Sequence, residues 1–115
     1  MQVPRIIEVD DRWWTDIAQR EKKVEGRKAN PKWNSLQLGD VVAIQRKSDQ
    51  RQCELQITDL RWYPTLFDFL LNEGLRIVLP GITTMEEAIA EYLKYSTVDE
   101  YRQFGVMAIE LDDVC

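Results

Sequence analysis

Apolar and polar residues alternate along some parts of the chain and recur every three or four positions along others, which predicts a mixture of strands and helices. The expected strands cover residues 6–9, 22–27, 41–44, 53–60 and 106–109. The expected helices cover residues 12–18, 66–73, 85–93 and a short stretch that begins after Ser96 or Thr97 and ends at Gly105. Two other segments are expected to be irregular: a turn at Asn30-Pro31, because the residue before a proline is disfavoured in a helix, and a short connection at residues 75–79.

Helix-start signals support the later helices. Thr83 with Glu86 and Thr84 with Glu87 have the spacing of a capping box, in which side chains bond the free N–H groups of the first turn. The sequence contains no internal repeat, low-complexity stretch or linker, so the elements are expected to share one core. It therefore predicts a single domain over residues 1–115 with an α+β or small-barrel fold, rather than a doubly wound sheet in which strands and helices alternate regularly.

The composition narrows the class of protein. With 44% apolar residues and four Trp in 115 residues, the chain can build a core and is not expected to be disordered. The sequence has no apolar run that approaches the roughly 18 residues needed to cross a bilayer, and its N-terminus lacks a secretory signal, so we expect an intracellular protein with no membrane partner. The absence of His and the presence of only two Cys argue against structural zinc and His-dependent nucleophilic catalysis, and no cofactor is expected.

Positive charge is concentrated in one short segment, although the net charge of the chain is -5. Residues 20–32 hold six basic and two acidic side chains. Such a segment could place hydrogen-bond donors and an acceptor around a base edge with its phosphate nearby, and a solvent-exposed charged edge is the alternative. The candidate ligand-binding residues are Lys22, Lys23, Glu25, Gly26, Arg27, Lys28, Lys32 and Trp33.

Two features decide whether these residues form one site. In a regular strand Lys22 would point to the opposite face from Glu25 and Arg27, so we expect a bulge or turn at Gly26 or at the start of the strand. Trp33 lies in a polar stretch where no pattern requires burial, which makes it a candidate platform for stacking on a base. The core or its rim is the expected place for the tyrosines at positions 92, 95 and 101.

Several short motifs are spread over nearly the whole chain. They include Lys22-Lys23-Val24-Glu25-Gly26-Arg27, Leu38-Gly39-Asp40, Tyr63-Pro64-Thr65-Leu66, Leu79-Pro80-Gly81 and Gly105-Val106-Met107-Ala108-Ile109. Their order and spacing resemble the ASCH domain family. The resemblance implies a PUA-like fold, a small curved β-barrel with short helices covering its openings, and a cleft that relatives use for RNA or modified nucleotides. One position departs from the pattern, because Glu21 stands where members commonly have a small residue, often glycine.

A bacterial branch of the same superfamily implies an enzymatic alternative. Its members hydrolyse the amide of N4-acetylcytidine with a lysine, a threonine and a glutamate, and the resemblance places the lysine at Lys22 and the glutamate at Glu73. The threonine position is Glu25 in this chain. A carboxylate there would favour the charged form of Lys22, which opposes its use as a nucleophile or base. If the chain is an enzyme, the catalytic candidates are Lys22, Glu73 and Glu25.

Three functions are open from the sequence. The first is a module that binds RNA or a modified nucleotide in a basic cleft around residues 22–33. The second is a metal-independent amidohydrolase of an acylated nucleoside such as N4-acetylcytidine. The third is a protein-interaction module, in which the acidic helices between Glu86 and Glu100 meet a basic partner. No oligomeric state is predicted.

Overall fold

The computed structural model describes residues 3–114. In this part of the chain, five strands form one sheet: β1 (Arg5–Val9), β2 (Val24–Lys28), β3 (Val41–Arg46), β4 (Gln52–Tyr63) and β5 (Val106–Asp113). Six helices connect and cover them: α1 (Asp11–Ala18), α2 (Pro31–Asn34), α3 (Leu66–Glu73), α4 (Leu75–Val78), α5 (Met85–Tyr92) and α6 (Val98–Phe104). All five strands and the four longer helices expected from the sequence are present.

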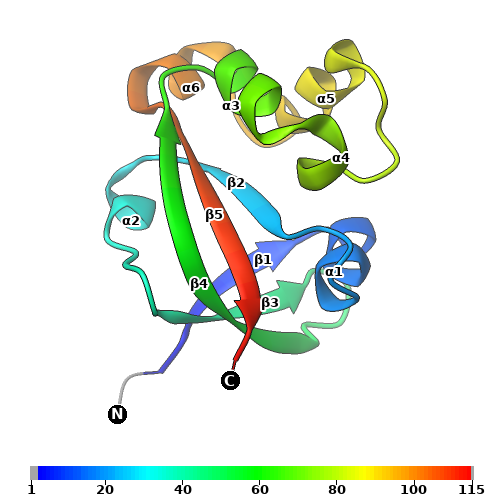
Figure 1. The fold of residues 1–115 in the computed structure, drawn as a ribbon, viewed down its shortest axis with the longest axis vertical. Coiled ribbons are helices and arrows are strands. Elements are labelled where there is room, and N and C mark those ends of the chain that lie inside the picture. Colours follow the sequence, from blue (N-terminus) through cyan, green and yellow to red (C-terminus); the bar gives the residue numbers. More distant parts are fainter. Residues whose placement is uncertain (1–2, 115) are drawn as a thin grey trace.

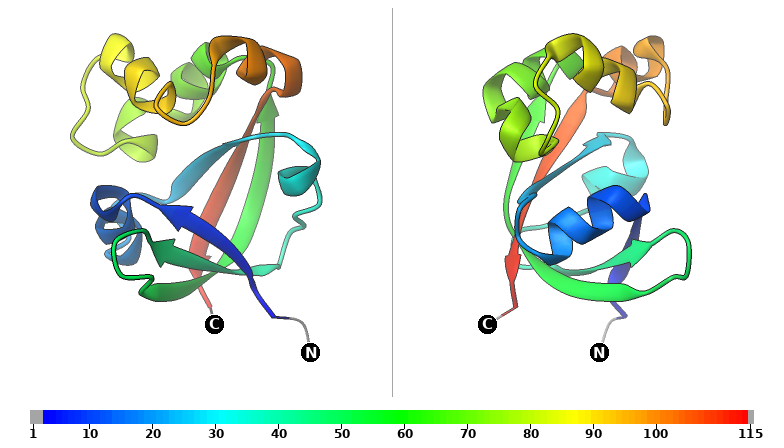
Figure 2. Two further views of the ribbon diagram at one scale, coloured as in Figure 1. Left: turned by 180° about the vertical axis from the view of Figure 1, so that it is seen from behind. Right: turned by 90° about the vertical axis from the view of Figure 1, so that its right-hand side faces the viewer.

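The sheet curls into an open barrel, as Figure 1 and Figure 2 show. Its strands lie in the order β1-β3-β4-β5-β2, with β1 parallel to β3 and the other neighbours antiparallel. Strands β1 and β2 are therefore the two ends of the sheet. A side chain joins them across the opening, since Arg27 Nη2 donates a hydrogen bond to the backbone oxygen of Glu8 at 2.7 Å.

The inner face of the sheet and the helices share one apolar core. Ile44 of β3 and Ile109 of β5 are fully buried in it. Helix α1 buries Trp13, Trp14 and Ile17, which fall on one side of the helix because of its 3.6-residue period. Trp14 Nε1 donates to the backbone oxygen of Ile44 at 2.9 Å, so the buried indole keeps a partner for its polar atom.

Helices α3 to α6 lie together over one end of the sheet (Figure 1). Helices α3, α5 and α6 each begin after a threonine whose Oγ1 accepts the N–H of the third residue on, which satisfies one free donor of the first turn. These capping residues are Thr65, Thr84 and Thr97. The protein therefore has the expected α+β fold, a PUA-like small barrel with short helices over its opening.

Two segments that were expected to be irregular are short helices. Asn30 and Pro31 start helix α2: Asn30 Oδ1 accepts the N–H of Trp33 at 3.3 Å, and Pro31 takes the first helical position, where a missing N–H loses no bond. Residues 75–79 contain helix α4. Within residues 3–114, none of the helices combines the length and the apolar character that crossing a membrane requires.

Candidate functional site

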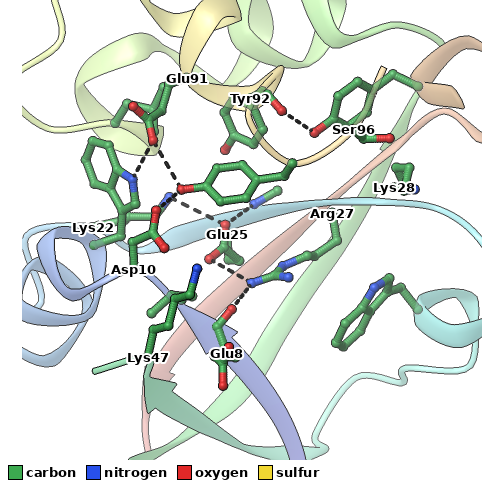
Figure 3. Close-up of a pocket in the computed structure, with 17 residues that line it drawn as sticks. Glu8, Asp10, Lys22, Glu25, Arg27, Lys28, Lys47, Glu91, Tyr92 and Ser96 are labelled. Atoms are coloured by element: carbon green, nitrogen blue, oxygen red, sulfur yellow. Dashed lines mark hydrogen bonds and ion pairs between the residues drawn. The ribbon is translucent and has the colours of Figure 1, made fainter. Parts of the chain in front are cut away.

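A pocket of about 360 Å³ lies between the open edge of the sheet and the helices α5 and α6 (Figure 3). One wall comes from the end of β1 and the residue that follows it, including Glu8 and Asp10. A second wall is residues 25–28 of β2, and a third comes from α5 and the segment after it, including Glu91 and Tyr92. The pocket therefore depends on segments that are distant in the sequence.

Lys22 reaches this pocket through a tight turn that precedes β2. Arg20 has a left-handed backbone conformation (φ 66°), and the N–H groups of Glu21 and Lys22 both donate to the backbone oxygen of Asp16, at 2.8 and 3.0 Å. The expected break in the strand thus lies at its start. Because Arg20 carries the left-handed φ, the turn accommodates a side chain at position 21.

The ammonium group of Lys22 is buried, with 1% of the residue exposed. Its Nζ donates to the backbone oxygens of Val24, at 2.7 Å, and Val78, and it lies 3.9 Å from Glu25 Oε1. Burial lowers the pKa of Lys22, while the carboxylate of Glu25 acts in the opposite direction. All three neighbours are acceptors, so the charged lysine fits this place and holds the Glu25 carboxylate on the pocket wall.

Glu25 and Arg27 form a charged pair on the open edge of β2 (Figure 3). Glu25 Oε1 accepts the N–H of Gly26 at 2.9 Å, and Glu25 Oε2 lies 3.7 Å from Arg27 Nη2. A Cβ at Gly26 would lie 2.6 Å from the Phe69 ring and 2.9 Å from the Tyr92 hydroxyl, so only glycine fits. The pocket wall therefore carries a carboxylate acceptor and a guanidinium donor with a glycine between them.

Trp33 forms another part of the wall and is held there by helix α2. Only 7% of the residue is exposed. Three cations surround its ring: Arg5, Arg27 and Lys32 lie 5.3, 5.4 and 4.8 Å from the ring centroid. The expectation of a polar loop was wrong at this point, because the short helix turns the indole inward, where it lines the pocket.

The helical wall contributes tyrosines that the sequence assigned only to the core or its rim. Tyr92 and Tyr101 are buried and line the pocket, whereas Tyr95 is half exposed. The Tyr95 hydroxyl donates to Asp10 Oδ2 and lies 3.2 Å from Glu91 Oε2. Burial and the bond to Asp10 both raise the pKa of Tyr95. The bond to Asp10 links the helical wall to the start of α1.

Glu91 strengthens this link and was missed by the sequence analysis. Its Oε2 accepts a hydrogen bond from Trp13 Nε1 at 3.2 Å, and its Oε1 accepts one from Lys94 Nζ at 2.9 Å. Burial acts to raise the pKa of Glu91, but the bonds from Lys94 and Trp13 outweigh it, and the pKa is lowered. Glu91 is therefore a charged carboxylate on the pocket wall with partners on both oxygens.

Solved structures share this architecture. The crystal structure of the hypothetical protein PH0355 matches with a TM-score of 0.85 and 24% identity, covering 97% of this chain and 100% of that one. The solution structure of protein PF0455 from Pyrococcus furiosus matches with a TM-score of 0.75 and 27% identity, covering 96% of each chain. A crystal structure of a mutant of ZmASCH from Zymomonas mobilis matches with a TM-score of 0.65 and 14% identity, covering 96% of this chain and 71% of that one. This chain has the ASCH domain fold. No protein-family model matches the sequence, and no curated protein does.

In this ASCH fold the charges that line the pocket are balanced. The cationic side chains are Lys22, Arg27, Lys28 and Lys47. The carboxylates are Glu8, Asp10, Glu25 and Glu91. The positive charge of residues 20–32 is thus offset by carboxylates from other segments, and the pocket wall presents donors and acceptors together. Within residues 3–114, no group of three or more Cys, Asp or Glu side chains is placed to hold a metal ion.

Three of the other candidate residues, Lys23, Lys32 and Glu73, are not part of the lining of the ASCH-fold pocket. Lys28 lines it but pairs with Glu100 at 2.8 Å, and the exposed Lys23 and Lys32 are not part of the lining. Glu73 is held elsewhere, by two bonds of 2.7 Å from Arg61 and one from the Tyr63 hydroxyl. The fold brings together Lys22, Glu25, Gly26, Arg27, Lys28 and Trp33.

Proposed function

We propose that this chain binds RNA or a modified nucleotide and takes a single base into the pocket. Trp33 and Tyr101 supply aromatic surface, and Glu25 and Arg27 offer an acceptor and donors to a base edge. The volume of about 360 Å³ lies within the range of roughly 300–1,000 Å³ of small-molecule sites. The observation that carries the proposal is the charged pair beside Gly26 inside an aromatic-lined pocket, and the ASCH fold supports it.

The balance of charge favours a base over a phosphate as the group inside the pocket. A phosphate there would meet four carboxylates as well as four cations. The exposed Lys23 and Lys32 lie outside the lining and can attract the phosphates of an RNA chain that continues beyond the bound base. We therefore expect the pocket to recognise the base and the surrounding lysines to add a salt-sensitive contribution.

A hydrolase is the second candidate, favoured by the contact between Lys22 and Glu25 in the pocket. In such a reaction Glu25 would accept a proton from the water that attacks the amide carbonyl of an acylated nucleoside. The C–N bond would then break as that proton passes to the departing amine, and the acetic acid that forms would lose its own proton to solvent and become acetate. Glu73 has no part in this candidate mechanism, because Arg61 and Tyr63 hold it outside the pocket.

The first experiment separates binding from hydrolysis. Isotope-labelled protein is mixed with N4-acetylcytidine, and the backbone amide shifts and free acetate are followed together by NMR. We expect shifts in residues 22–33 and 91–101 without acetate. Acetate that is released by the wild type and lost in Lys22→Ala would establish the hydrolase instead. Lys23→Ala is the matched control, because it removes a neighbouring lysine that is exposed and outside the lining.

A second variant and a second ligand complete the test. Replacing the buried Lys22 risks the fold, so Glu25→Gln is the second variant: it removes the carboxylate charge and keeps nearly the same side-chain shape. Short single-stranded RNA then replaces the nucleoside, and an affinity that falls with salt supports RNA binding. If neither nucleoside nor RNA shifts any signal of the folded protein, the proposal is wrong. The acidic helices α5 and α6 would then be tested as a surface for a basic protein partner.

A further inference from the structure

Tyr92 has a buried hydroxyl on the pocket wall with no hydrogen-bond partner among the described residues. Only 6% of the residue is exposed. Its ring is fixed by edge-on packing, with ring centroids 5.7 Å from Phe69 and 6.4 Å from Tyr101. The hydroxyl reaches the edge of β2, where a Cβ on Gly26 would lie 2.9 Å from it. Packing therefore accounts for the position of the ring but not for the presence of the hydroxyl.

An unpaired buried hydroxyl destabilises a folded protein, because it gives up hydrogen bonds to water and gains none. Other tyrosine hydroxyls nearby have partners. Tyr101 donates to the backbone oxygen of Tyr92 at 2.9 Å, and the hydroxyls of Tyr95 and Tyr63 donate to carboxylates. A phenylalanine at position 92 would give the same ring packing without this cost. The hydroxyl is thus explained best by a partner that arrives with the ligand.

The neighbouring groups define the chemistry of that partner. Burial, with the charge of Glu25 adding to it, raises the pKa of Tyr92 well above its usual value, so the hydroxyl keeps its proton and can donate it in a hydrogen bond. The Glu25 carboxylate precedes Gly26 on the same strand edge and can only accept. A complementary ligand therefore presents a hydrogen-bond acceptor beside an N–H donor. A phosphate has acceptors alone and would be repelled by Glu25, whereas every nucleobase has such an edge.

We propose that Tyr92 and Glu25 together read one edge of the bound base. Tyr92 donates to a carbonyl oxygen or ring nitrogen, and Glu25 accepts from the neighbouring N–H. This inference rests on the proposed function and adds to it the Tyr92 hydroxyl, which works as a donor beside the Glu25 acceptor. It makes Tyr92 a residue of specificity, because a ligand without the acceptor would leave the hydroxyl unpaired in the complex as well.

The test uses Tyr92→Phe with Tyr63→Phe as the matched control. Both remove one hydroxyl, but the Tyr63 hydroxyl lies outside the pocket and is bonded to Glu73. Urea unfolding is measured for each, and cytidine, uridine, adenosine, guanosine and ribose 5-phosphate are titrated by NMR. We expect Tyr92→Phe to keep or raise the urea midpoint and to weaken the best-bound nucleoside about tenfold. Tyr63→Phe should lower the midpoint and leave binding unchanged.

The outcomes separate this inference from the proposed function. If the wild type binds a nucleoside and Tyr92→Phe binds it equally well, the inference is wrong and the proposed function stands. A fall in the urea midpoint of Tyr92→Phe as large as that of Tyr63→Phe would also overturn it, because the hydroxyl would then have a partner in the free protein. Ribose 5-phosphate binding as tightly as the nucleosides would exclude reading of the base. If the wild type binds neither nucleoside nor RNA, both proposals are wrong.

Discussion

Gly26 lies where strand β2 passes against Phe69 of α3 and Tyr92 of α5. Its backbone has no left-handed conformation, so the requirement for glycine is one of space. We expect Gly26→Ala to destabilise the protein by about 1–3 kcal/mol, because the added methyl group must displace an aromatic ring from a packed core. Urea unfolding measures the loss, and a ligand titration should show weaker binding, since Tyr92 is displaced.

A double variant tests that explanation. Phe69→Leu shortens the side chain that a Cβ at Gly26 would meet at 2.6 Å. The double variant should therefore lose less free energy of unfolding than the sum of the losses in the two single variants. Strictly additive losses would show that crowding against Phe69 is not the cause.

Glu73 is a carboxylate whose role the structure assigns to stability. Its pKa is lowered, mainly by the hydrogen bonds from Arg61. A carboxylate with a depressed folded-state pKa stabilises the fold above its unfolded pKa, and this contribution is lost as the pH falls through the folded-state value. We expect Glu73→Gln to lower the free energy of unfolding by about 2 kcal/mol at neutral pH. The difference from wild type should narrow below pH 4.5, the ordinary value for this group.

Urea unfolding of both proteins over a series of pH values checks this expectation, and ligand binding at neutral pH is the control. Binding should be unchanged, because Glu73 is not part of the pocket lining. A difference in stability that stays constant down to acid pH would contradict the assigned ion pair. A loss of binding or turnover would restore Glu73 as a candidate for the site.

At the scale of elements, the stability of helix α6 affects the pocket, because α6 supplies part of its wall. It presents Tyr101 to the pocket and pairs Glu100 with Lys28 of β2. Thr97 caps its first turn by accepting the N–H of Glu100 at 3.1 Å. We expect Thr97→Ala to cost about 1 kcal/mol and to speed amide hydrogen exchange in α6. Thr97→Ser keeps the hydroxyl and should retain most of the stability and the slow amide exchange of the wild type. An equal loss of stability in the two variants would contradict the capping role.

The sequence predicted the elements whose signals are local. Strand alternation and the spacing of Thr84 from Glu87 identified β4 and α5, because both patterns depend on neighbouring residues only. Helices α2 and α4 were missed because a helix of four residues is too short to show a 3.6-residue repeat. The pair Asn30 and Pro31 did carry a helix signal, since asparagine is a good N-cap and proline suits the first helical position.

The sequence predicted only the part of the candidate site that is formed by residues close together in the chain. Lys22, Glu25 and Arg27 are neighbours in the sequence, so one unusual segment marked that wall of the pocket. Tyr92 and Glu91 belong to a helix whose apolar spacing looks the same whether it faces a core or a pocket. Their place opposite β2 follows from the packing of α5 over the sheet, which no local pattern specifies.

At the scale of the whole molecule, the helical layer and the sheet meet at the pocket, and Tyr95 joins them. Its hydroxyl donates to Asp10 at the start of α1, while half of the residue is exposed. We expect Tyr95→Phe to have little effect on the free energy of unfolding and to raise the ligand dissociation rate roughly three- to tenfold, because one link between the two walls is lost. NMR line shapes during titration measure this rate.

A second substitution separates the effect of the hydrogen bond to Asp10 from the effect of the Tyr95 ring. Tyr95→Leu removes the aromatic surface as well, so a further increase in the dissociation rate would report contact between the ring and the ligand. Unchanged kinetics in Tyr95→Phe would contradict a role for the bond to Asp10 in retaining the ligand.

The side chain of Arg27 bridges the gap between β1 and β2, and this gap keeps the stability of the sheet apart from the composition of the pocket. The hydrogen-bonded ladders from β1 to β2 by way of β3, β4 and β5 give the sheet its stability, and residues at its two ends line the pocket. Substitutions at those ends can therefore change what the pocket accepts without breaking a strand pairing. One scaffold can in this way acquire a new ligand through a few changes at the gap while the rest of the sheet stays the same.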